Sequence, residues 1–86
     1  MDNEVEFQNS THNDWHVLSI IGRIDVATSA AVEETGTATL TAAEKIALDM
    51  SATDYISSAG LRALLRLSKK AKRAKKNLRD LTGNLP

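Results

Sequence analysis

The stretch IALDMSATDYISSAGLRALL, residues 46–65, decides the fold. Its first part alternates apolar residues with others, as a β-strand does, and its last part has leucines at helical spacing. The junction SSAG, residues 57–60, supplies two hydroxyl side chains, and serine is among the residues that best cap a helix N-terminus. A strand that passes directly into a helix is typical of an α/β protein, in which helices pack on a largely parallel sheet.

The upstream sequence contains further strand signals. Residues 4–10 predict a short edge strand, which the turn-forming residues 11–14 join to a second strand at residues 15–21. Both alternating sets of side chains in the second strand are largely apolar, which favours a strand covered on both faces. Gly22 ends or bends this strand. We expect the second strand to lie beside, and parallel to, a strand at residues 45–50.

A first helix is expected between these two strands. We place it at residues 27–34, with Asp25 or Thr28 as its cap. Gly36 and the threonines around it weaken helix formation beyond this range.

A second helix follows the junction and is amphipathic. Its expected cap is Ser57 or Ser58, and its apolar positions are expected to pack on the sheet. These positions are Leu61, Leu64, Leu65, Ser68 and Ala71. The basic positions are expected to face solvent, and they are Arg62, Arg66, Lys69, Lys70, Arg73 and Lys76. Residues 77–86 predict a short helical turn at best.

Composition and charge narrow the class of protein. The chain has 86 residues, enough for one small domain, and it has no cysteine, which excludes disulfides and thiolate chemistry. The net charge is zero, yet residues 1–60 carry ten acidic and two basic side chains, whereas residues 61–86 carry nine basic and one acidic. The sequence has neither a signal-peptide pattern nor a run of apolar residues long enough to span a bilayer, so a cytoplasmic location is expected.

Two parts of the sequence carry a resemblance to a known family. GRID at residues 22–25 and the stretch at residues 46–65 resemble the STAS domain, the fold of bacterial anti-sigma-factor antagonists and of the cytoplasmic tails of sulfate transporters. The resemblance covers residues 15–70 and implies a small mixed, largely parallel β-sheet packed with helices. The family continues after the basic helix with a strand and a closing helix, for which residues 75–86 are too short. We therefore expect residues 1–86 to form a single STAS-like domain with an incomplete C-terminal strand and helix.

The resemblance also implies a site at the junction. In the antagonists, a serine at the helix start is phosphorylated by a kinase that is also the anti-sigma factor. Aligning Gly60 with the family glycine puts Ser58 at the acceptor position, Ser57 at the position of a family aspartate and Ala59 at that of a second serine. Ser58 is thus the implied phosphorylation site, with Ser57 as the alternative. The implied partner-binding residues are Asp25, Ser57, Ser58, Ala59, Gly60 and Arg62.

Elementary chemistry gives these residues simpler roles as well. A serine at a helix start is commonly a cap, and an aspartate before a run of small residues commonly caps the following turn. For Ser58 the two roles are compatible, because a helix N-terminus favours an anion such as a phosphate group.

The function that the resemblance implies is a phosphorylation-switched binding module without catalytic activity, metal or cofactor. Its partners would be an anti-sigma serine kinase, which binds ATP, and a protein phosphatase that resets the switch. Two alternatives stay open: a STAS subunit that docks to a membrane transporter ATPase complex, and a nucleic-acid binder that uses the basic helix. The basic helix lacks the interleaved aromatic residues on which bases stack, which argues against direct nucleic-acid binding.

Overall fold

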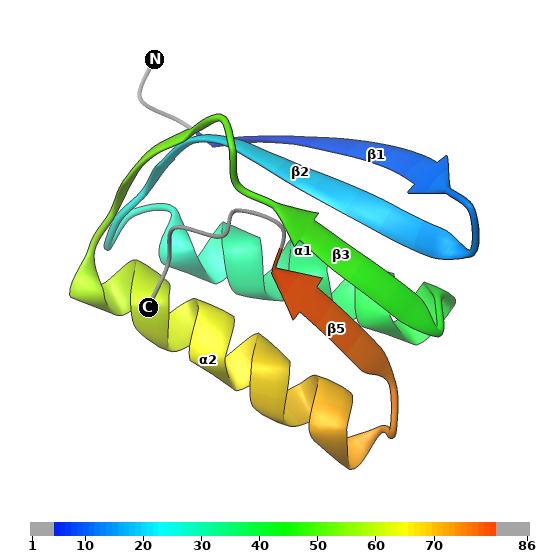
Figure 1. The fold of residues 1–86 in the computed structure, drawn as a ribbon. Coiled ribbons are helices and arrows are strands. Elements are labelled where there is room, and N and C mark those ends of the chain that lie inside the picture. Colours follow the sequence, from blue (N-terminus) through cyan, green and yellow to red (C-terminus); the bar gives the residue numbers. More distant parts are fainter. Residues whose placement is uncertain (1–4, 81–86) are drawn as a thin grey trace.

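The structure is a computed structural model that describes residues 5–80. Strands and helices largely alternate along the chain (Figure 1). The elements are β1 (Glu6–His12), β2 (Trp15–Ile24), α1 (Ser29–Ala42), β3 (Lys45–Asp49), β4 (Thr53–Ile56), α2 (Ser58–Arg73) and β5 (Asn77–Asp80).

The strands form one mixed sheet in the order β1-β2-β3-β5, with β4 paired to β2. β1 and β2 form an antiparallel hairpin, whereas β3 and β4 both run parallel to β2, and β5 runs parallel to β3. The expected parallel neighbours at 15–21 and 45–50 are confirmed, as is the fold class of a largely parallel sheet packed with helices.

Gly22 is the point at which β2 changes partner. Its φ of 112° lies in the region that only glycine adopts easily, and the register between β2 and β4 shifts between Gly22 and Arg23. β2 therefore bends at Gly22 and continues to Ile24. Of the two expectations for Gly22, the bend is confirmed and the end of the strand is not. The strand β4, residues 53–56, was not predicted, because its four residues read as part of a turn.

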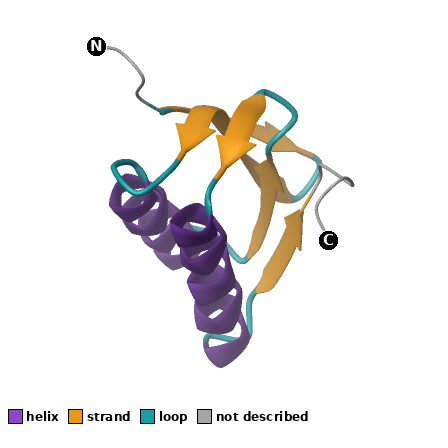
Figure 2. Ribbon diagram, turned by 90° about the vertical axis from the view of Figure 1, so that its left-hand side faces the viewer, coloured by secondary structure: helices purple, strands orange, loops and turns teal. Residues whose placement is uncertain are grey.

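Both helices lie on the same face of the sheet (Figure 2). The buried core lies between these layers and draws on β2, β3 and both helices. Its largest buried side chains are Leu18, Ile20, Ile24, Val32, Ile46 and Leu67. The prediction that β2 is covered on both faces was wrong, because no helix of residues 5–80 lies over the opposite face, where Trp15 and Val17 are partly exposed.

The first helix is longer than predicted and reaches Ala42 rather than residue 34. The hydroxyls of Thr37, Thr39 and Thr41 donate to the carbonyl oxygen four residues earlier, so these side chains add hydrogen bonds to the helix. Gly36 lies within the helix at the point where α2 packs against it. A Cβ at this position would lie 2.5 Å from Leu67 Cδ1, so the close packing favours glycine.

The second helix has the predicted position but a different buried face. Leu61 and Leu65 are 41% and 55% exposed, and Ser68 is exposed, so their assignment to the sheet-facing side was wrong. Gly60, Ala63 and Leu67 are buried in their place, and the two small residues let α2 pack closely on the rest of the domain. The buried positions of α2 are Gly60, Ala63, Leu64, Leu67 and Ala71.

The predicted helical turn after the second helix is also wrong within the described residues. Asn77–Asp80 forms the strand β5, in which Leu78 pairs with Ile46 of β3 and packs against the core. Residues 81–86, where a closing helix was considered, lie outside the described residues, so the expectation that the C-terminal strand and helix are incomplete stays a prediction.

Candidate functional site

The loop between β4 and α2 presents the two serines in different ways. Ser57 is the N-cap of α2: its backbone is extended, with φ −82° and ψ 173°, and its Oγ accepts a hydrogen bond from Gly60 N at 3.1 Å. Ser58 is the first residue of the helix and is exposed. Of the two candidate caps, Ser57 makes the capping bond, and Ser58 is the hydroxyl that faces solvent.

This loop is fastened to the end of β2. Ser57 N donates to Ile24 O at 2.8 Å, and Ile24 pairs with Ile56. Gly60 approaches the same residue so closely that a Cβ would lie 2.6 Å from both Ile24 O and Ile24 Cγ2. The GRID segment and the SSAG junction, which are far apart in the sequence, therefore meet, and Gly60 is required by space.

Asp25 organises the turn that leads from β2 into α1. Its Oδ1 accepts from the backbone N–H groups of Ala27 at 3.0 Å and Thr28 at 3.2 Å, and Arg23 Nε lies 3.6 Å from Oδ2. Desolvation acts to raise the pKa of Asp25, but the hydrogen bonds from Thr28 and Ala27 and the charge of Arg23 outweigh it, so the pKa is lowered. The Asp25 carboxylate thus stabilises the turn in which it lies. A contact of Asp25 with a partner stays a prediction.

A group of exposed apolar side chains lies on the segments that meet at this loop. We name it the exposed apolar group. Its members are Val26, Tyr55, Leu61 and Leu65, with 77%, 47%, 41% and 55% of their surface exposed. The guanidinium of Arg23 covers one side of the Tyr55 ring, at 4.7 Å from the centroid. Sequence reasoning missed this group, because it placed both leucines in the core.

Two of the predicted binding residues on α2 differ in exposure. Ala59 is half-buried beside Gly60, whereas Arg62 is exposed one helical turn after Ser58. Ser58 and Arg62 are thus both exposed in the first two turns of α2, as are Leu61 and Leu65 of the exposed apolar group.

The basic residues of α2 and of the segment that follows it do not all face solvent. Lys69 and Arg73 are exposed as expected, but the prediction was wrong for Lys76, whose side chain is only 16% exposed and donates to Leu40 O at 2.6 Å. Lys70 is turned toward α1, where it meets Glu33. The free positive charge of the helix is therefore smaller than its sequence indicates.

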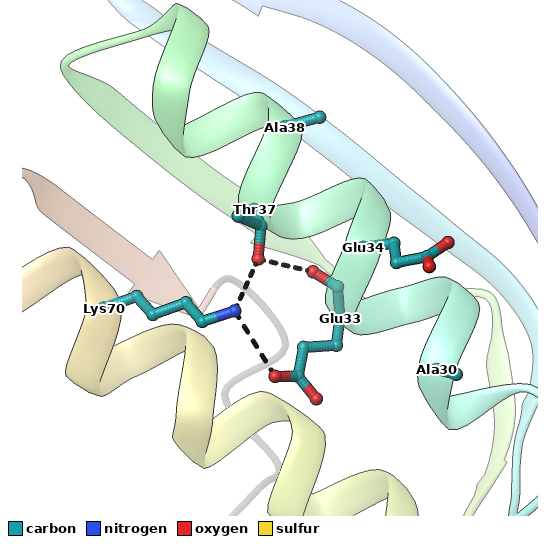
Figure 3. Close-up of a pocket in the computed structure, with 6 residues that line it drawn as sticks. All are labelled: Ala30, Glu33, Glu34, Thr37, Ala38 and Lys70. Atoms are coloured by element: carbon teal, nitrogen blue, oxygen red, sulfur yellow. Dashed lines mark hydrogen bonds and ion pairs between the residues drawn. The ribbon is translucent and has the colours of Figure 1, made fainter.

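A shallow groove of about 470 Å³ lies beside α1 and α2, away from the β4–α2 loop (Figure 3). Its lining residues are Ala30, Glu33, Glu34, Thr37, Ala38 and Lys70. Lys70 Nζ lies 3.3 Å from Glu33 Oε2 and donates to Thr37 Oγ1 at 2.9 Å. Desolvation acts to raise the pKa of Glu33, but hydrogen bonds from Arg66 and Lys70 outweigh it, and the pKa is lowered. This network joins the two helices.

Among residues 5–80, no cluster of three or more histidine, aspartate or glutamate side chains is placed to hold a metal ion. None of the helices that the structure describes is both long enough and apolar enough to cross a membrane.

Comparisons with solved structures show the same fold. An anti-sigma factor antagonist from Mycobacterium paratuberculosis matches with a TM-score of 0.81 and 22% identity, over 93% of this chain and 68% of that one. The antagonist STAS domain from Rhodobacter sphaeroides matches with a TM-score of 0.64 and 20% identity, over 93% and 86%. The Bacillus cell fate determinant SpoIIAA in its phosphorylated form matches with a TM-score of 0.66 and 13% identity, over 85% and 68%.

The sequence comparisons agree with the fold. No curated protein sequence matches the chain significantly. The sequence profile of the STAS domain matches residues 5–79, which is nearly the whole chain. The chain therefore belongs to the STAS domain family.

Proposed function

We propose that this STAS domain is an anti-sigma-factor antagonist: a binding module, without catalysis of its own, that binds an anti-sigma serine kinase and so releases a sigma factor. Phosphorylation of Ser58 is the switch, and a protein phosphatase resets it. The observation that carries this proposal is the exposed Ser58 hydroxyl at the start of α2, with apolar side chains exposed on the segments around it. Such a switch acts in the cytoplasm, where sigma factors act.

The geometry of the two serines favours Ser58 as the acceptor. A kinase needs a hydroxyl that can enter its active site, and Ser58 is exposed, with the half-buried Ala59 and the glycine Gly60 next along the chain. The Ser57 hydroxyl accepts the capping bond from Gly60 N, so a phosphate there would disturb the helix start. The known phosphorylated form of SpoIIAA, which shares this fold, supports phosphorylation as the means of switching.

A phosphate on Ser58 would change the docking surface more than the fold. It would add about −1.5 to −2 charges at a helix N-terminus, where the helix dipole and the exposed N–H groups favour an anion. Leu61 and Leu65 lie one and two turns further along α2 and are exposed. A partner that buries these leucines would have to desolvate the new charge beside them, so phosphorylation should weaken the complex.

We expect the kinase to bury members of the exposed apolar group when it binds this domain. Leu61 and Leu65 are both exposed one helical turn apart on α2, and contiguous exposed apolar surface commonly marks a protein interface. The basic residue Arg62 lies between the two leucines in the sequence and is exposed, which fits a polar rim around an apolar centre.

The nucleic-acid alternative finds no support in the structure. Lys70 and Arg66 share the carboxylate of Glu33, which offsets part of their charge, and the Lys76 side chain is largely buried, so fewer free cations face the surface that would contact phosphates. The transporter alternative would use the same loop without its phosphorylation.

The test is phosphorylation by the anti-sigma serine kinases of the same genome, each incubated with the protein and ATP. Intact mass and peptide mapping report the modified residue, and affinity for the kinase is measured for each variant. We expect one phosphate, on Ser58, absent from Ser58→Ala and retained by the matched control Ser57→Ala. Ser58→Ala should bind the kinase permanently, whereas Ser58→Asp should bind it weakly.

Two outcomes would contradict the proposal in different ways. Phosphate on Ser57 alone would move the switch by one residue. Tight binding of a kinase that phosphorylates neither serine would leave a docking loop without a switch.

A further inference from the structure

The face of the sheet opposite α1 and α2 carries Trp15, the single tryptophan of the chain. Trp15 pairs with His12 of β1, and Val17 pairs with Ala47, which in turn pairs with Arg79 of β5. Residues directly opposite each other in neighbouring strands share a face, so four strands contribute side chains to one place. This place is at the start of β2, whereas the Ser58 loop is fastened to its end.

Two cations flank the indole ring of Trp15. Arg79 Cζ lies 5.1 Å and Lys45 Nζ 5.9 Å from the ring, within the range of cation–π contact. Lys45 has a carboxylate partner in Asp14 at 3.8 Å, but the Asp14 side chain is 85% exposed, so this pair is weak. Arg79 makes no ion pair within residues 5–79. The face is therefore cationic around its aromatic ring.

A cavity of about 180 Å³ opens between these side chains. It is lined by His12, Trp15, Val17, Ala47 and Arg79. Ala47 is only 2% exposed even though neither of the described helices lies over it, so the surrounding side chains enclose the floor of the cavity. The cavity thus has an apolar floor, one aromatic wall, and a guanidinium and an imidazole among its lining groups.

We propose that this cavity binds a small organic anion with a flat apolar body, of the size of an aryl carboxylate. The planar fork of Arg79 matches the two oxygens of a carboxylate, and it stays charged at all physiological pH values. The apolar body lies over Val17 and Ala47 and beside the indole ring of Trp15, where it is removed from water. The cavity is smaller than the roughly 300–1,000 Å³ of sites for larger ligands, which limits the ligand to about one ring.

Trp15 makes this site directly observable. The intact chain is titrated with benzoate while tryptophan fluorescence and backbone amide NMR shifts are recorded. Benzamide, which lacks the charge, and acetate, which lacks the ring, are the comparison probes. We expect saturable binding of benzoate with amide shifts on β2, β3 and β5, and binding of both comparison probes weaker by at least about tenfold.

Variants test the role of the guanidinium. Arg79→Gln should weaken benzoate binding by at least about tenfold, and Arg79→Lys, which keeps the charge but not the fork, should fall between that variant and the unchanged chain. Arg66→Gln, the same replacement on α2, is the matched control and should leave benzoate binding unchanged.

Four results would overturn the site. They are equal binding of benzoate and benzamide, equal binding of benzoate and acetate, amide shifts centred on α2, and an absence of saturable binding at millimolar benzoate. Neither Ser58 nor the exposed apolar group takes part, so failure here would leave the proposed switch untouched.

Discussion

Replacement of Gly60 by alanine tests how close the first turn of α2 lies to the end of β2. The new Cβ would lie 2.6 Å from Ile24 O and from Ile24 Cγ2, so the helix start and the strand would have to separate by roughly 0.8 Å to reach a normal contact of 3.4 Å. Overpacking of this kind costs about 1–3 kcal/mol, and the higher helix propensity of alanine returns at most about 1 kcal/mol. The new Cβ would meet Ile24 O, a backbone atom that also accepts a hydrogen bond from Ser57 N and so cannot easily move away. We therefore expect the free energy of unfolding to fall by about 2 kcal/mol.

Urea unfolding followed by circular dichroism measures this loss, with an unchanged dependence on urea concentration as the sign that only stability changed. Gly36→Ala is the matched control, because it brings the same gain in helix propensity. Its Cβ would meet the terminal methyl groups of Leu67 rather than backbone, and a side chain can rotate away. We expect a loss of at most about 1 kcal/mol for Gly36→Ala. A Gly60→Ala variant as stable as the unchanged chain would refute the close approach.

Three further predictions concern stability and the switch. Leu67→Ala should cost about 2–5 kcal/mol in urea unfolding, whereas Leu65→Ala should cost less than about 0.5 kcal/mol; similar losses would show that the buried face of α2 is misassigned. Hydrogen bonds from α2 outweigh desolvation and lower the pKa of Glu33 from its ordinary value of 4.5. The ionised Glu33 therefore stabilises the folded protein above pH 4.5, and this stabilisation is lost as the pH falls through the pKa of the folded state. Glu33→Gln should therefore be less stable near neutral pH and approach the unchanged chain in acid, and parallel thermal melts over a pH series would contradict this. Ser57→Ala should lower stability by about 1 kcal/mol through loss of the cap and leave phosphorylation of Ser58 intact; equal stability would mean that the cap bond contributes nothing.

The strands β2 and β3 and the start of α2 could be predicted from sequence because each has a strong local signal. β3 alternates with large apolar side chains at Ile46 and Leu48, which are 1% and 4% exposed. Ser57 stands where a capping residue is expected, and its hydroxyl makes the cap bond. Local chemistry and tertiary structure agree at these positions, so a single sequence was sufficient.

The buried face of α2 could not be predicted from the positions of its leucines. A search for large apolar residues selects Leu61 and Leu65, yet the helix packs closely and buries Ala63 and Leu67, which are each 1% exposed. The two faces differ by a rotation that the leucine pattern does not resolve. Small residues bury little area individually, but they decide how near two elements can come.

The length of α1 and the strand β5 depended on contacts that are distant in sequence. Gly36 reads as a helix breaker, but it is the position at which Leu67 reaches α1. Asn77–Asp80 has no clear strand pattern, and its pairing with β3 supplies the hydrogen bonds that make it a strand. The same limit applied to the candidate site: the resemblance pointed to Ser58, whose phosphorylation stays a prediction, whereas the exposed leucines could be found only from the packing of α2.

The central position of β2 determines the order in which parts of the domain open to solvent. β2 has hydrogen-bonded neighbours on both sides, with β1 on one side and β3 followed by β4 on the other. Amide hydrogens of such a strand exchange with solvent only when a large part of the molecule opens, whereas β1 and β5 lie at the edges and can detach alone. Ser57 N is bonded to Ile24 O, which lies beyond the pairing with β1 that ends at Ile21, and among the described strands Ile24 pairs with β4 alone. The Ser58 loop is therefore attached to the end of β2 that has a strand on one side, and we expect a modification there to leave the middle of β2, near Leu18, closed to solvent exchange.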